Sequence, residues 1–199
     1  SVRFSKDAVL NAAYQLVRRA GPDALNARAV ARELGGSTQP IFRLFSGMEE
    51  LKQAVTEMTL LTWKERLRQR LQTSAFPYLS IGMSFLLFAR DEPELFKLLF
   101  MRDRVSDGSC TDYNVDWGIP LIEDTVKVDV DTARKLYQRN WLFCYGLAVS
   151  IATKYIPCIS ECKMRQLLVE SLNVTRKHTR VHRRVQMKAP TVSEHQPLI

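Results

Sequence analysis

The sequence predicts an all-α fold, with a small N-terminal three-helix unit and a larger helical bundle after it. Apolar residues recur at the three- and four-residue spacing of amphipathic helices along most of the chain. Only 8 Gly and 8 Pro occur among 199 residues, which disfavours a loop-rich all-β design. The hydrophobic fraction of 46% is large enough to build a packed core.

Two helices are predicted at the N-terminus. Residues 6–20 form the first, and Ser5 precedes it as a candidate N-cap. Residues 27–34 form the second, which Asn26 can cap. Gly35 follows it at a position where a positive backbone dihedral costs little.

A third short helix over 38–45, capped by Ser37, is predicted to follow directly, and a fourth runs over 48–70. The fourth opens on a candidate capping box in which Ser46 and Glu49 exchange hydrogen bonds with the backbone. Two short helices joined by a glycine-containing turn and enclosed by longer helices indicate a helix-turn-helix.

This N-terminal segment resembles the DNA-binding signature of the TetR family of transcriptional regulators. The resemblance is carried by LNARAVARELG at 25–35, STQPIFRLF at 37–45 and MEEL at 48–51. It implies a DNA-binding domain over 1–47, a regulatory and dimerisation domain over 48–186, and a flexible tail over 187–199. It further implies a repressor that a small-molecule effector releases from its operator.

The third helix is the predicted recognition helix, because such a helix enters the major groove with its N-terminal residues facing the bases. Gln39 can pair with adenine and Arg43 with guanine, while Arg28 and Lys52 suit phosphate contacts. For each, a solvated side chain is the alternative. The predicted DNA-binding residues are Arg28, Ser37, Thr38, Gln39, Pro40, Phe42, Arg43 and Lys52.

Two positions of this segment depart from the family pattern. Phe42 stands where a tyrosine is common, so it offers no hydroxyl to a phosphate. Met48 stands where a lysine is frequent. We therefore expect the grip on the DNA backbone to depend more on Arg28, Arg43 and Lys52.

Further helices are predicted along the rest of the chain. The segment 76–92 is apolar almost all round, as expected of a buried central helix. The other predicted helices cover 93–101, 116–128, 131 or 132 to about 154, and about 160–184.

Two segments of the predicted bundle bear a looser resemblance to one TetR subgroup: FARDEPELF at 88–96 and WLFCYGLA at 141–148. Tyr145 stands where a histidine is common in the second. The resemblance implies a homodimer in which the last two long helices pair with their twins on a near-palindromic DNA site. The apolar surface would come from Leu142, Leu147, Val149, Ile151, Leu167, Leu168 and Leu172.

A pocket for a small lipophilic effector is expected between the central helices, since such pockets are mostly apolar with a few polar anchors. Ordinary core packing is the alternative for each candidate. The candidates are Trp63, Met83, Phe85, Phe88, Phe100, Trp117, Trp141 and Tyr145.

The net charge of +8 is concentrated near the C-terminus. Residues 1–52 hold 8 Lys and Arg against 5 Asp and Glu, whereas residues 163–188 hold 8 against 1. The basic run within 163–188 is interpreted as a solvated helix face and consists of Arg176, Lys177, Arg180, Arg183 and Arg184. The alternative function uses it as a docking surface for a controlling protein partner, and absence of a sizeable apolar cavity would favour that alternative.

The sequence carries no catalytic signature, so we expect no enzyme, no cofactor and no metal site. His178 and His182 are spaced like metal ligands, but arginines surround them. The four cysteines are irregularly spaced, which favours reduced thiols in the cytoplasm. No apolar stretch approaches the length of about 20 residues that a membrane-spanning helix needs.

Overall fold

A computed structural model describes residues 4–103 and 115–186, with side chains described for 4–103 and 118–173. This part of the chain contains helices and no strand, which confirms the all-α prediction. The elements are α1 (Lys6–Ala20), the 3-10 turn η1 (Pro22–Ala24), α2 (Ala27–Glu33), α3 (Gln39–Leu44), α4 (Met48–Gln72), α5 (Pro77–Asp91), α6 (Pro93–Phe100), α7 (Val115–Val126), α8 (Val130–Ala152) and α9 (Glu161–Gln186).

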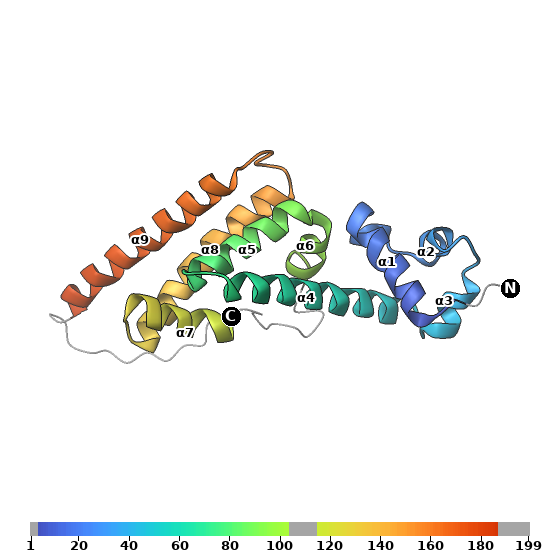
Figure 1. Ribbon diagram of the computed structural model, residues 1–199, viewed down its shortest axis with the longest axis horizontal. Helices are drawn as coiled ribbons and strands as arrows, with labels where there is room; N and C mark the ends of the chain where they lie inside the picture. Colours follow the sequence, from blue (N-terminus) through green and yellow to red (C-terminus); the bar gives the residue numbers. More distant parts are fainter. Residues whose placement is uncertain (1–3, 104–114, 187–199) are drawn as a thin grey trace.

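The helices form an elongated molecule (Figure 1). Helices α1 to α3 group at one end, and the long helix α4 runs from them toward the other end. Helix α5 is central, because it packs against α4, α6, α7, α8 and α9. Helix α1 contacts α2, α4 and α6, so the N-terminal group lies directly against the bundle.

The first two helices begin at the predicted caps. The Ser5 hydroxyl accepts a hydrogen bond from the Ala8 amide at 3.1 Å. The Asn26 side chain accepts one from the Ala29 amide at 3.0 Å. Each cap satisfies a first-turn amide that has no partner within its helix. The turn after α2 holds Gly35 at φ 65°, the left-handed conformation that glycine adopts without strain.

The starts of α3 and α4 differ from the predictions. The N-cap of α3 is Thr38 rather than Ser37, and it makes no side-chain cap hydrogen bond. Helix α4 follows Gly47, and the predicted exchange with Glu49 is wrong. Glu50, one residue later, accepts a hydrogen bond from the Ser46 amide at 2.6 Å. A glutamate carboxylate still accepts the hydrogen bond of the Ser46 amide, but it belongs to Glu50 and not to Glu49.

One continuous core runs from the N-terminal group into the bundle. It includes Val17 of α1, Ile41 of α3, Trp63 of α4 and Leu168 of α9, all buried in a single cluster. In α5 every residue from Ser80 to Ala89 other than Gly82 is buried, as the apolar pattern predicts. Moving the N-terminal helices relative to the bundle therefore disturbs shared packing.

A buried carboxylate joins the two halves. Glu92, at the junction of α5 and α6, is only 5% exposed. It accepts two hydrogen bonds from Arg18 of α1, at 2.6 and 2.7 Å, and one from Arg66 of α4 at 2.7 Å. Burial raises the pKa of Glu92, but the hydrogen bonds and charges of the two arginines outweigh it and hold that pKa below its ordinary value.

In the described residues, no helix has both the length and the apolar character required to cross a membrane.

Candidate DNA-binding surface and apolar cavity

Helix α3 presents a polar surface on one side and core contacts on the other. Ile41 of α3 and Phe45, which directly follows it, are buried in the continuous core and anchor this short helix there. Gln39 and Arg43 are exposed on the opposite side, and Thr38 is half-buried. Phe42 lies on the exposed surface as well, with 55% of its area open to solvent.

The remaining predicted DNA contacts also lie at the surface. Arg28, Ser37 and Lys52 are exposed, and Pro40 in the first turn of α3 is half-buried. Exposure leaves these side chains able to meet a partner at the end of the molecule formed by α1 to α3 (Figure 1).

Ion pairs fix the helices that carry α3. Lys6 of α1 pairs with Glu50 of α4 at 2.8 Å and lies 4.6 Å from the centre of the Phe45 ring. The hydrogen bonds from Lys6 and from the Ser46 amide lower the pKa of Glu50 to about 2. This network brings the start of α4 and the end of α3 against α1.

A second pair holds α2 in place. The Arg19 guanidinium of α1 donates to both oxygens of Glu33 at the end of α2, at 2.6 and 3.4 Å. The hydrogen bonds to Arg19 keep the pKa of Glu33 below its ordinary value. Helix α2 is therefore attached to α1 by packing and by a peripheral charge pair.

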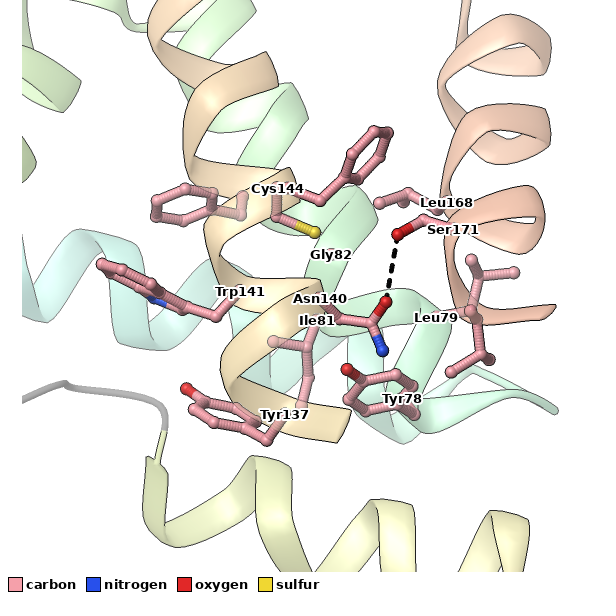
Figure 2. A pocket seen from close by; sticks show the side chains of 13 residues that line it. Tyr78, Leu79, Ile81, Gly82, Tyr137, Asn140, Trp141, Cys144, Leu168 and Ser171 are labelled. Atoms are coloured by element: carbon pink, nitrogen blue, oxygen red, sulfur yellow. Dashed lines mark hydrogen bonds between the residues drawn. The ribbon is translucent and has the colours of Figure 1, made fainter. Parts of the chain in front are cut away.

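An apolar cavity of about 50 Å³ lies between α5, α8 and α9 (Figure 2). Its wall on α9 includes Leu168 and Leu172, and its wall on α5 includes Gly82. No acidic or basic side chain of 4–103 or 118–173 lines it. The lining residues are Tyr78, Leu79, Ile81, Gly82, Phe85, Tyr137, Asn140, Trp141, Phe143, Cys144, Leu168, Ser171 and Leu172.

Polar atoms gather at one end of the cavity, around Asn140 of α8. The Ser171 hydroxyl of α9 donates to Asn140 Oδ1 at 3.1 Å, as the dashed line in Figure 2 marks. The amide nitrogen, Nδ2, turns toward the Tyr78 hydroxyl in that view. The proximity of the Asn140 amide slightly lowers the pKa of Tyr78. The contact does not have the geometry of a hydrogen bond, so Nδ2 has no acceptor.

Two titratable groups of the lining, Tyr78 and Cys144, are neutral at pH 7. Burial, with a smaller contribution from Cys144, raises the pKa of Tyr78 above its ordinary value of 10.0. Burial raises the pKa of the Cys144 thiol to about 12. The cavity therefore offers hydrogen-bonding groups without formal charge.

The predicted pocket residues divide between this cavity and the core. Phe85 and Trp141 line the cavity. Tyr145 stacks on Trp141 at 5.1 Å between ring centres and donates its hydroxyl to the Phe100 carbonyl at 2.7 Å. The side chain of Trp117 lies outside those described. The four remaining candidates are buried in the main core, where aromatic rings surround Trp63: Trp63, Met83, Phe88 and Phe100.

Sequence reasoning missed the polar end of the cavity. Asn140 is 5% exposed, although asparagine is usually at the surface. It lies one helical turn after Leu136 and two turns before Ala148, which are both buried on α8. A polar residue within an apolar helical stripe is a signal that could have identified it.

The outer faces of α8 and α9 expose apolar side chains. Leu142 of α8 is 63% exposed and Val169 of α9 is 40% exposed, while Phe143 of α8, which also lines the cavity, is 37% exposed. Of the residues predicted for a dimer surface, Ile151 and Leu168 are buried in the chain's own core. The other predicted residues, Leu147, Val149, Leu167 and Leu172, are half-buried.

Metal-binding clusters of three or more His, Cys, Asp or Glu do not occur in the part of the chain that the structure describes. Cys144, Cys158 and Cys162 are free thiols, and Cys110 lies outside the described residues. The side chains of the predicted basic run on α9, from Arg176 onward, are outside the described set, and so is the predicted tail over 187–199.

No protein-family model matches the chain, and no curated protein matches it either.

Proposed function

We propose that this chain is a TetR-like transcriptional regulator that binds near-palindromic operator DNA as a homodimer and is released by a small uncharged effector. The observation that carries the proposal is the exposure of Gln39 and Arg43 on one side of α3, whose other side is anchored by buried Ile41. A short helix supported in this way can enter a major groove while its own packing stays intact.

The chemistry of these side chains suits direct readout. A glutamine amide pairs with the N6 and N7 edge of adenine, and a guanidinium pairs with O6 and N7 of guanine. Arg28 and Lys52, exposed on α2 and α4, suit contacts to phosphates on either side of the groove. The exposed Phe42 ring, which lacks a hydroxyl, suits apolar contact with a thymine methyl rather than a phosphate.

Two copies are required for a palindromic site, and the exposed apolar residues of α8 and α9 supply a candidate contact. In a two-fold dimer the two recognition helices would lie roughly 34–36 Å apart, about one turn of B-form DNA. Leu142 and Val169 are the exposed members of this surface that we expect the dimer to cover.

Selection from random duplex DNA by the full chain tests the proposal. We expect enriched sequences with two inverted half-sites about one helical turn apart. Affinity should fall steeply as salt rises from about 50 to 200 mM, because phosphate contacts release counterions. Enrichment of no sequence, or of sites without inverted symmetry, would refute the proposal as stated.

A second candidate is regulation by a protein partner instead of an effector, and the small volume of the cavity favours it. A dry cavity that accommodates benzene measures about 150 Å³, whereas the cavity here measures about 50 Å³. An effector larger than a few heavy atoms therefore needs α9 to move. Operator binding that no small molecule alters, but that an added partner protein does alter, would identify this second mode.

A further inference from the structure

We infer that the cavity between α5, α8 and α9 binds a small uncharged organic molecule that accepts a hydrogen bond from Asn140 Nδ2. This inference names the effector class of the proposed function, and it rests on that function for its regulatory meaning. The binding itself depends only on the cavity and is measurable without DNA.

The lining excludes charged ligands. Among the side chains that the structure describes, no Asp, Glu, Lys or Arg lines the cavity, so an ionised group there would lose its hydration without gaining a counter-charge from them. Tyr78 and Cys144 of the lining stay protonated at neutral pH. Most of the ligand surface must therefore be apolar.

Asn140 sets the polar requirement. Its Oδ1 already accepts from Ser171, while its buried Nδ2 turns toward the Tyr78 hydroxyl without meeting an acceptor in hydrogen-bond geometry. A buried donor without a partner costs free energy that an incoming acceptor recovers. A ketone, ester or amide oxygen placed at this end satisfies Nδ2, whereas a hydrocarbon of the same shape leaves it unpaired.

Helix α9 forms the adjustable wall of the cavity. Gly82 has no side chain, and a Cβ there would come within 3.1 Å of Leu168 Cδ1, so α5 and α9 approach closely at this point. The hydrogen bond from Ser171 to Asn140 connects α9 to α8 beside it. A ligand that fills more than the existing volume pushes α9 away from α5 and α8, and so reaches the apolar outer surface proposed for the dimer.

Three matched probes test the inference on the full chain by NMR. Cyclopentanone carries the acceptor, cyclopentane lacks it, and cyclopentanecarboxylate replaces it with a charge. We expect cyclopentanone to shift the Asn140 side-chain amide signals and to bind about tenfold more tightly than cyclopentane. The carboxylate should not bind at concentrations where the ketone saturates.

Variants locate the effect. Asn140→Leu removes the donor with little change in volume, and we expect it to abolish the preference for the ketone over the hydrocarbon. Ser171→Ala is the control, because it leaves Nδ2 in place and should keep the preference. Equal affinity for ketone and hydrocarbon in the unaltered chain would overturn the inference, even if the Leu variant failed to fold.

The two proposals fail separately. If random-DNA selection yields a palindromic site but cyclopentanone leaves the Asn140 signals unmoved, the inference about the ligand is wrong and the DNA-binding proposal stands. If the ketone binds as expected but no DNA is enriched, the cavity assignment stands and the proposed regulator does not.

Discussion

Arg18 and Glu92 form an ion pair that joins helix α1 directly to the centre of the bundle. The guanidinium of α1 meets both carboxylate oxygens at the junction of α5 and α6, at 2.6 and 2.7 Å. Arg66 of α4 donates a third hydrogen bond to the Glu92 carboxylate, at 2.7 Å. Because bidentate pairs fix orientation as well as distance, Glu92 sets the angle at which α1 meets the bundle.

Glu92→Gln should destabilise the protein. The neutral amide cannot balance two arginines, and a buried position with lost charge-assisted hydrogen bonds predicts a loss of about 1–3 kcal/mol in the free energy of unfolding. Urea denaturation at pH 7 measures it. Glu65→Gln is the matched control, since it breaks an exposed pair with Arg68 on α4 and should change stability far less than Glu92→Gln does. Similar losses for the two variants would show that Glu92 has no special part in joining the halves.

The Lys6–Glu50 pair predicts a specific pH dependence. The folded pKa of Glu50 is about 2, below its ordinary value of 4.5, so the ionised form is favoured by folding. Its stabilisation is therefore complete above about pH 4.5 and is lost as pH falls from 4.5 toward 2. The difference in urea midpoint between the natural chain and Glu50→Gln should be constant from pH 7 to 5 and shrink below pH 4.5.

Direct titration of the Glu50 carboxyl by NMR provides the check. Lys6→Met removes the first of the hydrogen bonds that lower this pKa, so the value should rise from about 2 toward 4.5. The Ser46 amide remains in the variant and should keep the rise incomplete. An unchanged pKa after Lys6→Met would mean that the pair is not formed in solution.

Local sequence signals predicted most of the helix ends. Ser5 and Asn26 cap α1 and α2 because their side chains reach backbone amides only three residues away, and such contacts need no tertiary structure. The prediction that Glu49 completes the capping box was wrong by one residue. Either of two neighbouring glutamates can reach the Ser46 amide, and the contact of Glu50 with Lys6 of α1, 44 residues away, favours the second.

The cavity was much less predictable than the helices. Helical periodicity separates buried from exposed positions, and it placed Phe88 in a buried central helix, as the structure confirms. Which buried residues border an empty volume depends on how α9 rests on α5 and α8. The spacing between α5 and α9 depends on Gly82 and Leu168, which are 86 residues apart in the sequence. No local sequence pattern therefore predicts the cavity.

Arg43→Ala should weaken binding to the selected operator. Loss of one bidentate base contact costs about 1–3 kcal/mol, which corresponds to roughly 5- to 150-fold in Kd, and should relax the base preference at one position of each half-site. Fluorescence anisotropy with the selected duplex measures both effects. Arg134→Ala on α8 removes the same charge from an exposed position distant in sequence from α3, and should leave Kd and base preference unchanged. If both variants lost affinity equally, the effect would be one of net charge and not of α3.

Leu142→Glu should prevent the association of two chains. Leu142 is 63% exposed on α8, and a carboxylate introduced there would be buried without a counter-charge in the proposed interface. Light scattering should give the mass of one chain, 22.9 kDa, where the natural chain gives about twice that value. Leu61→Glu is the matched control, since Leu61 is 68% exposed on α4 and lies outside the proposed surface.

A second expectation concerns DNA binding. Because a dimer would bind both half-sites at once, the Leu142 variant should lose its preference for the palindrome. It should still bind a single half-site no more weakly than the natural chain. A Leu142 variant that remained dimeric would place the contact between copies elsewhere than on α8.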